Sequence, residues 1–411
     1  MMQADVTGFL FPNDYHVMWS LMIVVYPYVT GLVAGAFIVS SLYHVFGRSE
    51  LKPVARLSMV ASFAFLAVAT LPLLAHLGHP ERAFNIVITP NFTSAMSAFG
   101  MIYTLYLLLL VFEIWLVFRK DIILVARRSR GPKRWIFKLL ALGCYDVSDE
   151  ALQNDNRVIV VLAAIGIPAA CILHGYVGFM FGSVKANAFW STPLMPIIFL
   201  FSAVTSGVAM IMVLYQSVAK LNGRRIDGAC VQSLAQWLWL FAILTFTLEL
   251  LEIVSLAYEK SEEWVIIGEL LGTKLAFSFI GIQMVFGSLI PFLLLGIVVL
   301  LRRYLTDPLR NVIAVSAALI LLVQVFAMRW NVVIGGQIFS KSMRGFRESY
   351  SPELFGREGI VVAVVIFVIP FIIMAVFNRF LPLHLRSDEE GDESAPAEPA
   401  KRLEPGLSDP H

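Results

Sequence analysis

The sequence predicts an all-α integral membrane protein with about nine membrane-spanning helices. Charged residues make up only 15% of the 411 residues, whereas soluble proteins have roughly 25%. The mean hydropathy is +0.78, and long apolar stretches recur along the whole chain. A helix needs about 20 apolar residues to cross the hydrocarbon core of a bilayer. The net charge of +2 gives no reason to expect a nucleic-acid partner.

Nine stretches meet this length requirement, and each is expected to form one membrane-spanning helix. In chain order they are residues 17–46, 55–78, 94–118, 157–181, 193–219, 232–258, 273–301, 311–330 and 359–380. The predicted units are a first four-helix bundle (1–181), a second bundle (182–330), an outer loop with the last helix (331–385) and a disordered acidic cytoplasmic tail (386–411). The expected architecture is therefore two four-helix bundles plus one additional C-terminal helix.

Glycine and proline punctuate several of these spans. Gly31 and Gly35 lie four residues apart in the first span, a spacing that allows two helices to approach closely. Proline within a span is expected to kink or loosen the helix, and neighbouring groups must then satisfy the freed carbonyls. The prolines in question are Pro27, Pro72, Pro168, Pro291 and Pro370.

The distribution of basic residues predicts the orientation. Most of the 31 Lys and Arg residues fall in the loops that follow odd-numbered spans and in the tail. Positive charge stays on the cytoplasmic side of the membrane, so the N-terminus is expected outside and the C-terminus in the cytoplasm. In the most basic loop, residues 127–143 could form an interfacial helix with Trp135, Ile136, Phe137 and Leu139 facing lipid. A basic loop that only sets the topology is the alternative.

Polar side chains gather at the predicted outer ends of the first four spans. The histidines there are His16, His76, His79 and His174, and the accompanying residues are Asp14, Tyr15, Arg82, Tyr176 and Lys185. Ionisable groups at membrane depth are costly and usually functional. Bound quinone needs hydrogen-bond donors for two carbonyls and groups that exchange protons, as histidine and tyrosine do. We therefore expect a quinone site here, with His16, Tyr176 and His76 in the catalytic roles.

Simpler explanations exist for several of these side chains. His76 could be an interfacial anchor, and His79, beside Pro80, could be a loop residue. Tyr176 could belong to the aromatic belt that membrane proteins place at the interface. His174 and Tyr176 are two residues apart, so they do not share a helix face.

A second set of buried charges suggests proton-path candidates. These residues are Glu113, Glu249, Glu252, Lys274 and His44. Glu249 and Glu252 are three residues apart and share a helix face, which should point into the bundle. Lys274 is a candidate counterion for them. A structural ion pair is the alternative to a relay, and Glu113 and His44 are close enough to the inner surface to snorkel towards it.

The cysteines predict that this chain holds no metal centre of its own. Cys144, Cys171 and Cys230 are isolated, and the sequence has no C-x-x-C or C-x-x-C-H motif. Such motifs ligate iron–sulfur clusters or attach c-type haem. Metal centres of those kinds must therefore belong to a partner.

Three stretches resemble the NrfD/PsrC (polysulfide reductase-type) family of membrane subunits. The run from Tyr176 to Pro196, with Trp190-Ser-Thr-Pro-Leu-Met-Pro196 at its end, resembles the family's Y-T-G…W-x-T-P-L-x-P. The run from His76 to Arg82 resembles D-L-G-R-P-E-R, and the glycines of the first span fit its glycine-rich first helix. The second half is similar to the longer branch of HybB-, Qrc- or alternative complex III-type subunits.

The resemblance implies a quinone-reactive subunit of a respiratory oxidoreductase complex in the bacterial inner (cytoplasmic) membrane. Such a subunit exchanges electrons between menaquinone or ubiquinone and an extracytoplasmic ferredoxin-like Fe–S subunit, and the exchange can be coupled to proton movement. Molybdopterin-type and multihaem cytochrome c subunits are further expected partners. The matching site residues are Tyr176 and His16, while His76 and His79 replace the family's usual Asp and Arg. A b-haem-binding anchor, a non-redox transporter and a structural anchor remain alternatives.

Overall fold

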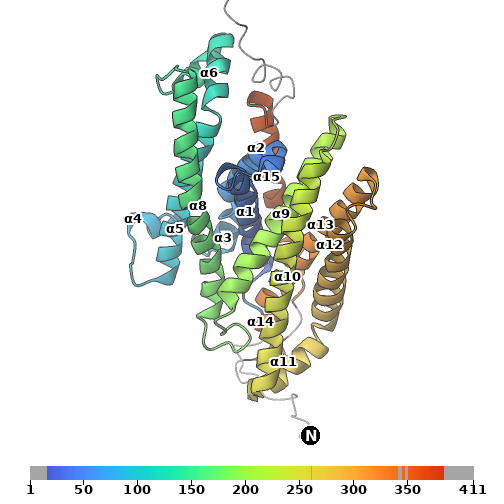
Figure 1. Ribbon diagram of the computed structural model, residues 1–411. Coiled ribbons are helices and arrows are strands. Elements are labelled where there is room, and N and C mark those ends of the chain that lie inside the picture. Colours follow the sequence, from blue (N-terminus) through green and yellow to red (C-terminus); the bar gives the residue numbers. More distant parts are fainter. Residues whose placement is uncertain (1–15, 261, 341–344, 348–349, 384–411) are drawn as a thin grey trace, which may run out of the picture.

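The computed structural model describes residues 16–260, 262–340, 345–347 and 350–383. Within these residues nine helices are long and apolar enough to cross a membrane, which confirms the predicted all-α, multi-pass class (Figure 1). Asp14 and Tyr15 of the predicted site and the predicted tail at 386–411 lie outside the described residues.

The spans follow the predicted order. They are α1 (Leu21–His44), α2 (Lys52–Val68) with α3 (Leu71–His76), α5 (Ala95–Val117), α8 (Asp149–Gly182), α9 (Met195–Leu221), α10 (Gly228–Glu259), η3 (Ala276–Leu289) with α12 (Ile290–Leu300), α13 (Asp307–Trp330) with η4 (Asn331–Gly335) and α14 (Gly336–Ile338), and α15 (Ile360–Phe380). The shorter elements are η1 (Ser49–Leu51), η2 (Pro80–Arg82), α4 (Asn85–Ile88), α6 (Arg119–Arg128), α7 (Gly131–Leu140) and α11 (Glu262–Gly272). Within the seventh and eighth spans, η3 and η4 are π-helices.

The two boundaries that differ most from the prediction are in the fourth and eighth spans. The fourth span begins at Asp149, because Ser148 caps the helix by accepting a hydrogen bond from the backbone of Ala151. The first two turns after this cap are polar, so hydropathy alone did not predict them as part of the span. The eighth span continues through η4 to Ile338, beyond the predicted end at residue 330.

The helices close two rings that meet at α1 and α9. In one ring α1, α2, α5 and α8 contact one another in turn, and in the other α9, α10, α12 with η3, and α13 do so. The last helix, α15, packs against α2 and α3. We call the end at which α1 begins the N-terminal end of the bundle, lowest in Figure 1, and the end at which α15 finishes the C-terminal end.

Glycine brings α1 and α9 into backbone contact. A Cβ atom at Gly35 would overlap the Val204 carbonyl oxygen, and one at Gly207 would lie 2.5 Å from the Gly35 Cα. At Gly31 the nearest atoms, of Ala203, would be 3.4 Å away, which is ordinary contact. Helices in lipid gain little from burying apolar side chains against one another. Small residues at such a crossing let the backbones pack closely, and this packing stabilises the contact.

Of the five prolines predicted to kink or loosen a span, two coincide with interruptions, in the second and seventh spans, whereas Pro27, Pro168 and Pro370 lie inside the continuous helices α1, α8 and α15. The helix stops at Val68 and restarts at Leu71, just before Pro72, and the π-helix η3 gives way to α-helix at Ile290, just before Pro291. Near the first break the Tyr103 hydroxyl donates a hydrogen bond to the Leu66 carbonyl. A neighbouring helix therefore satisfies a carbonyl close to the proline break.

The two glycines of α1 give a direct test of this packing. Gly35→Ala should lower the free energy of unfolding by about 1–3 kcal/mol or prevent accumulation of the protein, because backbone atoms of α9 occupy the new methyl's place. Gly31→Ala is the matched control and should be tolerated. Thermal unfolding in detergent measures both variants, and equal stability would contradict the close contact.

Candidate functional site

The side chains predicted for the outer quinone site lie in several different environments. His16, His79, Arg82 and Lys185 are exposed at the N-terminal end. The His79 ring contacts Glu81, with Nδ1 2.9 Å from Oε1. These four residues therefore line the end of the bundle rather than a common buried pocket.

His76 contacts a carboxylate at the end of α3. It is the last residue of α3, and its Nδ1 lies 3.0 Å from Oε2 of Glu358 in the segment before α15. Nearby, the Arg357 guanidinium donates to the carbonyls of Leu74 and Leu77, 2.8 and 2.7 Å away. Both contacts fix the segment before α15 on the end of α3, where carbonyls of a helix terminus need partners.

The local charges also perturb Glu358. Partial burial raises the pKa of this carboxyl, but hydrogen bonds from Ser20 and His76 outweigh that effect and hold the pKa below its ordinary value. The carboxylate is thus the form that fits this environment.

His174 is a buried connection between two helices. Its Nδ1 faces the Ala170 carbonyl at 2.7 Å and its Nε2 faces the Thr30 carbonyl of α1 at 2.5 Å. Because both ring nitrogens are occupied by backbone carbonyls, the imidazole holds α8 against α1. It is not aimed into the predicted pocket.

Tyr176 lies in a cluster of four aromatic rings at the meeting of α1, α5 and α8. Its ring centroid is 6.4 Å from that of Phe99, which in turn lies 5.8 Å from Tyr26 and 6.1 Å from Tyr103. The Tyr176 hydroxyl donates to the Ala95 carbonyl at 2.9 Å. We call these four residues the tyrosine cluster. It presents phenol groups at the N-terminal end of the first ring, with Tyr103 and Tyr176 half-buried.

A depression of about 290 Å³ opens beside this cluster where α8 ends and α9 begins. It is lined by Phe179, Gly182, Ser183, Ser191, Thr192, Pro193 and Pro196. The Phe179 ring lies 5.2 Å from Tyr176, so the depression borders the tyrosine cluster. Small-molecule sites start at about 300 Å³, and this volume is close to that limit.

Glycine in α8 creates the close corner. A Cβ at Gly178 would lie 2.6 Å from the Met195 carbonyl oxygen, and one at Gly182 would lie 3.0 Å from that of Thr192. The start of α9 can therefore lie directly on the last turns of α8. The residues that carry the Tyr176–Pro196 sequence pattern form this corner.

Trp190 joins the corner to the second ring. Its indole nitrogen donates to the Val332 carbonyl at 2.6 Å, and its ring stacks on Trp19 with centroids 4.9 Å apart. Asn187 donates to the Gly336 carbonyl at 2.7 Å. The segment 187–196 is thus bound to the π-helical end of the eighth span.

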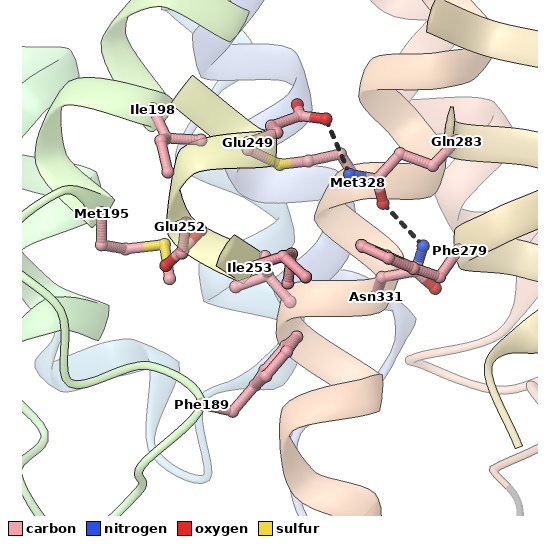
Figure 2. Close-up of a pocket in the computed structure, with 11 residues that line it drawn as sticks. Phe189, Met195, Ile198, Glu249, Glu252, Ile253, Phe279, Gln283, Met328 and Asn331 are labelled. Atoms are coloured by element: carbon pink, nitrogen blue, oxygen red, sulfur yellow. Dashed lines mark hydrogen bonds between the residues drawn. The ribbon is translucent and has the colours of Figure 1, made fainter. Parts of the chain in front are cut away.

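A second polar region lies inside the other ring, in a cavity of about 30 Å³ (Figure 2). Its lining residues are Phe189, Met195, Ile198, Glu249, Glu252, Ile253, Phe279, Gln283, Met328, Asn331 and Val332. A buried water needs about 10–15 Å³, so the cavity has room for about two. It is far too small for a quinone ring.

Hydrogen bonds in this cavity converge on Glu249. Ser278 donates to Asn331 at 2.7 Å, Asn331 donates to Gln283 at 2.8 Å, and Gln283 donates to Glu249 at 2.9 Å, the last two drawn in Figure 2. Gln324 adds contacts of 3.2 Å to both carboxylate oxygens. The π-helices η3 and η4 supply Ser278, Gln283 and Asn331, consistent with the frequent placement of π-helical turns at functional positions.

The expected counterion of the two glutamates is corrected by the structure. Lys274 is exposed, and Glu249 is held by side-chain amides instead. The buried cation with an electrostatic interaction with Glu249 is Arg329, whose guanidinium carbon lies 3.8 Å from the Phe199 ring centroid. Arg329 donates to Ser202 at 2.8 Å and to the Phe199 carbonyl at 3.2 Å. Lys274 was expected because its helix meets that of the glutamates at the outer side, but helix packing decides which cation lies near Glu249.

The carboxyl groups of Glu252 and Glu113 have fewer hydrogen-bond partners than that of Glu249. One oxygen of Glu252 and both oxygens of Glu113 are buried without a hydrogen-bond partner among the described residues. Glu113 interacts electrostatically with Tyr106 in the first ring. His44 is half-buried at the C-terminal end, and its buried Nε2 also has no hydrogen-bond partner among the described residues. Unmatched buried polar atoms commonly mark bound water.

Several residues of these two sites were not found from the sequence. Phe99 and Tyr103 look like ordinary members of an apolar span, and nothing local predicts that they surround Tyr176. Gln283, Gln324 and Asn331 did carry a signal, since amide side chains are uncommon in long apolar runs. They are uncharged, so a pattern of ionisable residues does not include them.

Comparison with known proteins identifies a family that covers most of the chain. The family described as Polysulphide reductase, NrfD matches residues 11–341. A selenate reductase subunit of Mesobacillus selenatarsenatis is 35% identical over 213 residues, which cover 50% of each chain. Protein NrfD of Escherichia coli is 25% identical over 199 residues, 47% of this chain and 58% of that protein. The chain thus spans about half the length of these relatives.

One longer match extends across both rings. The Hdr-like menaquinol oxidoreductase integral membrane subunit of Archaeoglobus fulgidus is 22% identical over 350 residues, 82% of this chain and 78% of that protein. The similarity therefore includes the segments that form the cavity around Glu249.

The lowered pKa of Glu358 predicts an acid-sensitive contact. Its stabilisation is present above the ordinary carboxyl pKa and is lost as pH falls through the lowered native value. Glu358→Gln should therefore cost less than about 1 kcal/mol at neutral pH, because the pair is partly exposed, and cost nothing at low pH. Unfolding of both proteins across pH measures this difference, and a pH-independent gap would contradict the assignment.

Proposed function

Because the chain belongs to the NrfD family, we propose that it is the quinone-reactive membrane subunit of a respiratory oxidoreductase complex. The names of its relatives support a reductase complex, and one of them is a menaquinol oxidoreductase subunit. In this proposal the chain exchanges electrons between menaquinone and an extracytoplasmic Fe–S partner. Molybdopterin-type and multihaem cytochrome c subunits are further proposed partners, and the complex lies in the bacterial inner membrane.

The tyrosine cluster and the adjoining depression carry the proposal. Phe179 lines the depression and offers an aromatic surface for a flat quinone ring, and the half-buried positions of Tyr103 and Tyr176 leave the neighbouring cluster accessible from the surrounding lipid. The Tyr176 hydroxyl donates to Ala95 but keeps an acceptor lone pair, so it can accept a hydrogen bond from a quinol hydroxyl. When bound, the quinone supplies the two-electron, two-proton chemistry.

His174 takes a positioning role in this proposal. Its contacts with Ala170 and Thr30 fix the rotation of α8 relative to α1, and that rotation aims Tyr176 at Phe99. His16, exposed beside the start of α1, is the proposed group for proton exchange at the surface. His76 binds Glu358, so we assign it to the rim of the site.

The cavity around Glu249 supports a proposed role in holding protons. It combines two carboxyl groups, an unmatched oxygen on Glu252 and space for water. A structural tether remains the alternative, since the amides around Glu249 connect α10, η3 and α13. Glu113 and His44 are proposed as the corresponding proton-holding groups of the first ring.

A b-haem anchor is less well supported by the geometry. Axial haem ligation takes two groups that face each other across iron. Here both ring nitrogens of His174 face backbone carbonyls, which leaves neither for iron. His16 and His79 are exposed at the end of the bundle.

Replacing Tyr176 by Phe tests the quinone site. In the assembled complex, Tyr176→Phe should lower quinol-dependent electron transfer about tenfold, the effect of losing one hydrogen bond worth about 1.4 kcal/mol. Tyr258→Phe is the matched control, because Tyr258 is exposed at the same end of the bundle. A photoreactive azidoquinone should label peptides of α5 and α8. Full activity in Tyr176→Phe, or labelling of α10 and η3 instead, would move the site elsewhere.

Replacing Glu249 by Gln separates proton transfer from tethering. Gln keeps the size of the side chain and one acceptor oxygen, but it puts an amide donor where Gln283 and Gln324 find the second acceptor oxygen, and it removes proton exchange. A relay role therefore predicts a drop in proton-coupled turnover of about tenfold or more, whereas a tether alone predicts a lower thermal unfolding temperature with turnover retained. Glu259→Gln, exposed on the same helix, is the control. Unchanged turnover in Glu249→Gln would leave only the tether.

A further inference from the structure

A basic helical hairpin projects from the C-terminal end of the first ring. It consists of α6 and α7 and follows α5 after a single residue, and we call residues 119–142 the basic hairpin (Figure 1). Within α7, Trp135 is 68% exposed and Leu139 is 61% exposed, and Ile136 and Leu140 extend the same face. The predicted lipid-facing set needs one correction: Phe137 is buried against Phe380, with ring centroids 6.4 Å apart.

Contacts fix the hairpin at the level where membrane spans end. The indole nitrogen of Trp115, two residues before the end of α5, donates to the Leu140 carbonyl at 2.7 Å. Phe137 packs on Phe380, the last residue of α15, and the Lys133 ammonium lies 5.4 Å from the Phe380 ring. Two different spans therefore finish beside α7, so its exposed apolar face lies at the depth of a bilayer surface.

The charges of the hairpin are almost all positive. Its basic residues are Arg119, Lys120, Arg127, Arg128, Arg130, Lys133, Arg134 and Lys138, and its acidic residue is Asp121. Some of this charge is used inside the protein: Arg119 pairs with Asp155 at 2.6 Å, and Asp121 pairs with Arg56 at 3.0 Å. The other seven cations are exposed.

Helical geometry separates the apolar and basic side chains of α7. Trp135 and Leu139 are four residues apart and share one face, whereas Arg134 and Lys138 share another. A helix with an apolar face, a basic face and a position at the bilayer surface has the properties of an interfacial helix. Its positive face matches negatively charged phospholipid headgroups.

We propose that the basic hairpin is a binding surface for anionic phospholipid. The apolar side chains of α7 enter the upper acyl region, and the exposed cations contact headgroup phosphates. The predicted orientation places this surface on the cytoplasmic leaflet, whose anionic lipids attract basic segments next to a membrane span. The proposal goes beyond quinone chemistry and does not depend on it.

The test measures lipid selectivity of the full chain in its complex. The complex is reconstituted into nanodiscs that contain spin-labelled phosphatidylglycerol or spin-labelled phosphatidylcholine as probes, and the immobilised fraction gives the relative association constant. The wild-type complex should prefer the anionic probe. In the triple variant Arg130→Gln, Arg134→Gln and Lys138→Gln, the ratio of the two association constants should fall at least fivefold.

The matched control removes equal charge at the same end of the bundle. Arg224→Gln, Arg225→Gln and Arg303→Gln alter exposed cations of other loops and should retain the preference. An equal loss in both triple variants, or no loss in the hairpin variant, would overturn the proposal.

Hydrogen exchange over residues 129–142 gives a second readout that does not require the triple variant. Exchange should be slower in nanodiscs rich in phosphatidylglycerol than in those of phosphatidylcholine, and the single variant Arg134→Gln should reduce this difference. Protection of the same size in both lipids would show that another subunit, or no anionic lipid, covers this face, and would also overturn the proposal.

Discussion

The backbone contact between α1 and α9 is the constraint on which the remaining arrangement depends. Within lipid, apolar side chains gain little by leaving their surroundings, so helices associate through close packing and hydrogen bonds. Gly35 and Gly207 let two backbones touch and make α1 and α9 the shared wall of both rings. Once that wall is fixed, the carbonyl of Thr30 meets His174, and the start of α1 meets Gln337, whose side-chain oxygen accepts from the Trp19 backbone at 2.8 Å.

One short segment borders both candidate sites. Ser191, Thr192 and Pro193 line the depression beside the tyrosine cluster, whereas Phe189 and Met195 line the cavity around Glu249. Trp190 lies between them and binds Val332 at the π-helical turn. The segment is therefore in contact with both rings.

The hydrogen-bonded side chains around the two candidate sites have different kinds of partners. In the first ring backbone carbonyls serve as partners, as for Tyr103, Tyr176 and His174. In the second ring side-chain amides form a directed series that ends at Glu249. The first pattern holds side chains in place. The second leaves one carboxyl group as the common acceptor beside space for water.

The sequence by itself determined the all-α membrane class, the order of the nine spans, the breaks at Pro72 and Pro291, and the family resemblance. These follow from local properties: the length of apolar runs, the missing amide hydrogen of proline and short residue patterns. It also singled out Tyr176 and Glu249. Only the tertiary structure decided their partners, since Phe99 and Tyr103 reach Tyr176 from another helix, and Gln283 and Gln324 reach Glu249 from two others. It likewise assigned His174 to Thr30 and placed Lys274 at the surface. A residue pattern records which groups a helix carries, but helix rotation and crossing decide which distant carbonyl or amide each group meets.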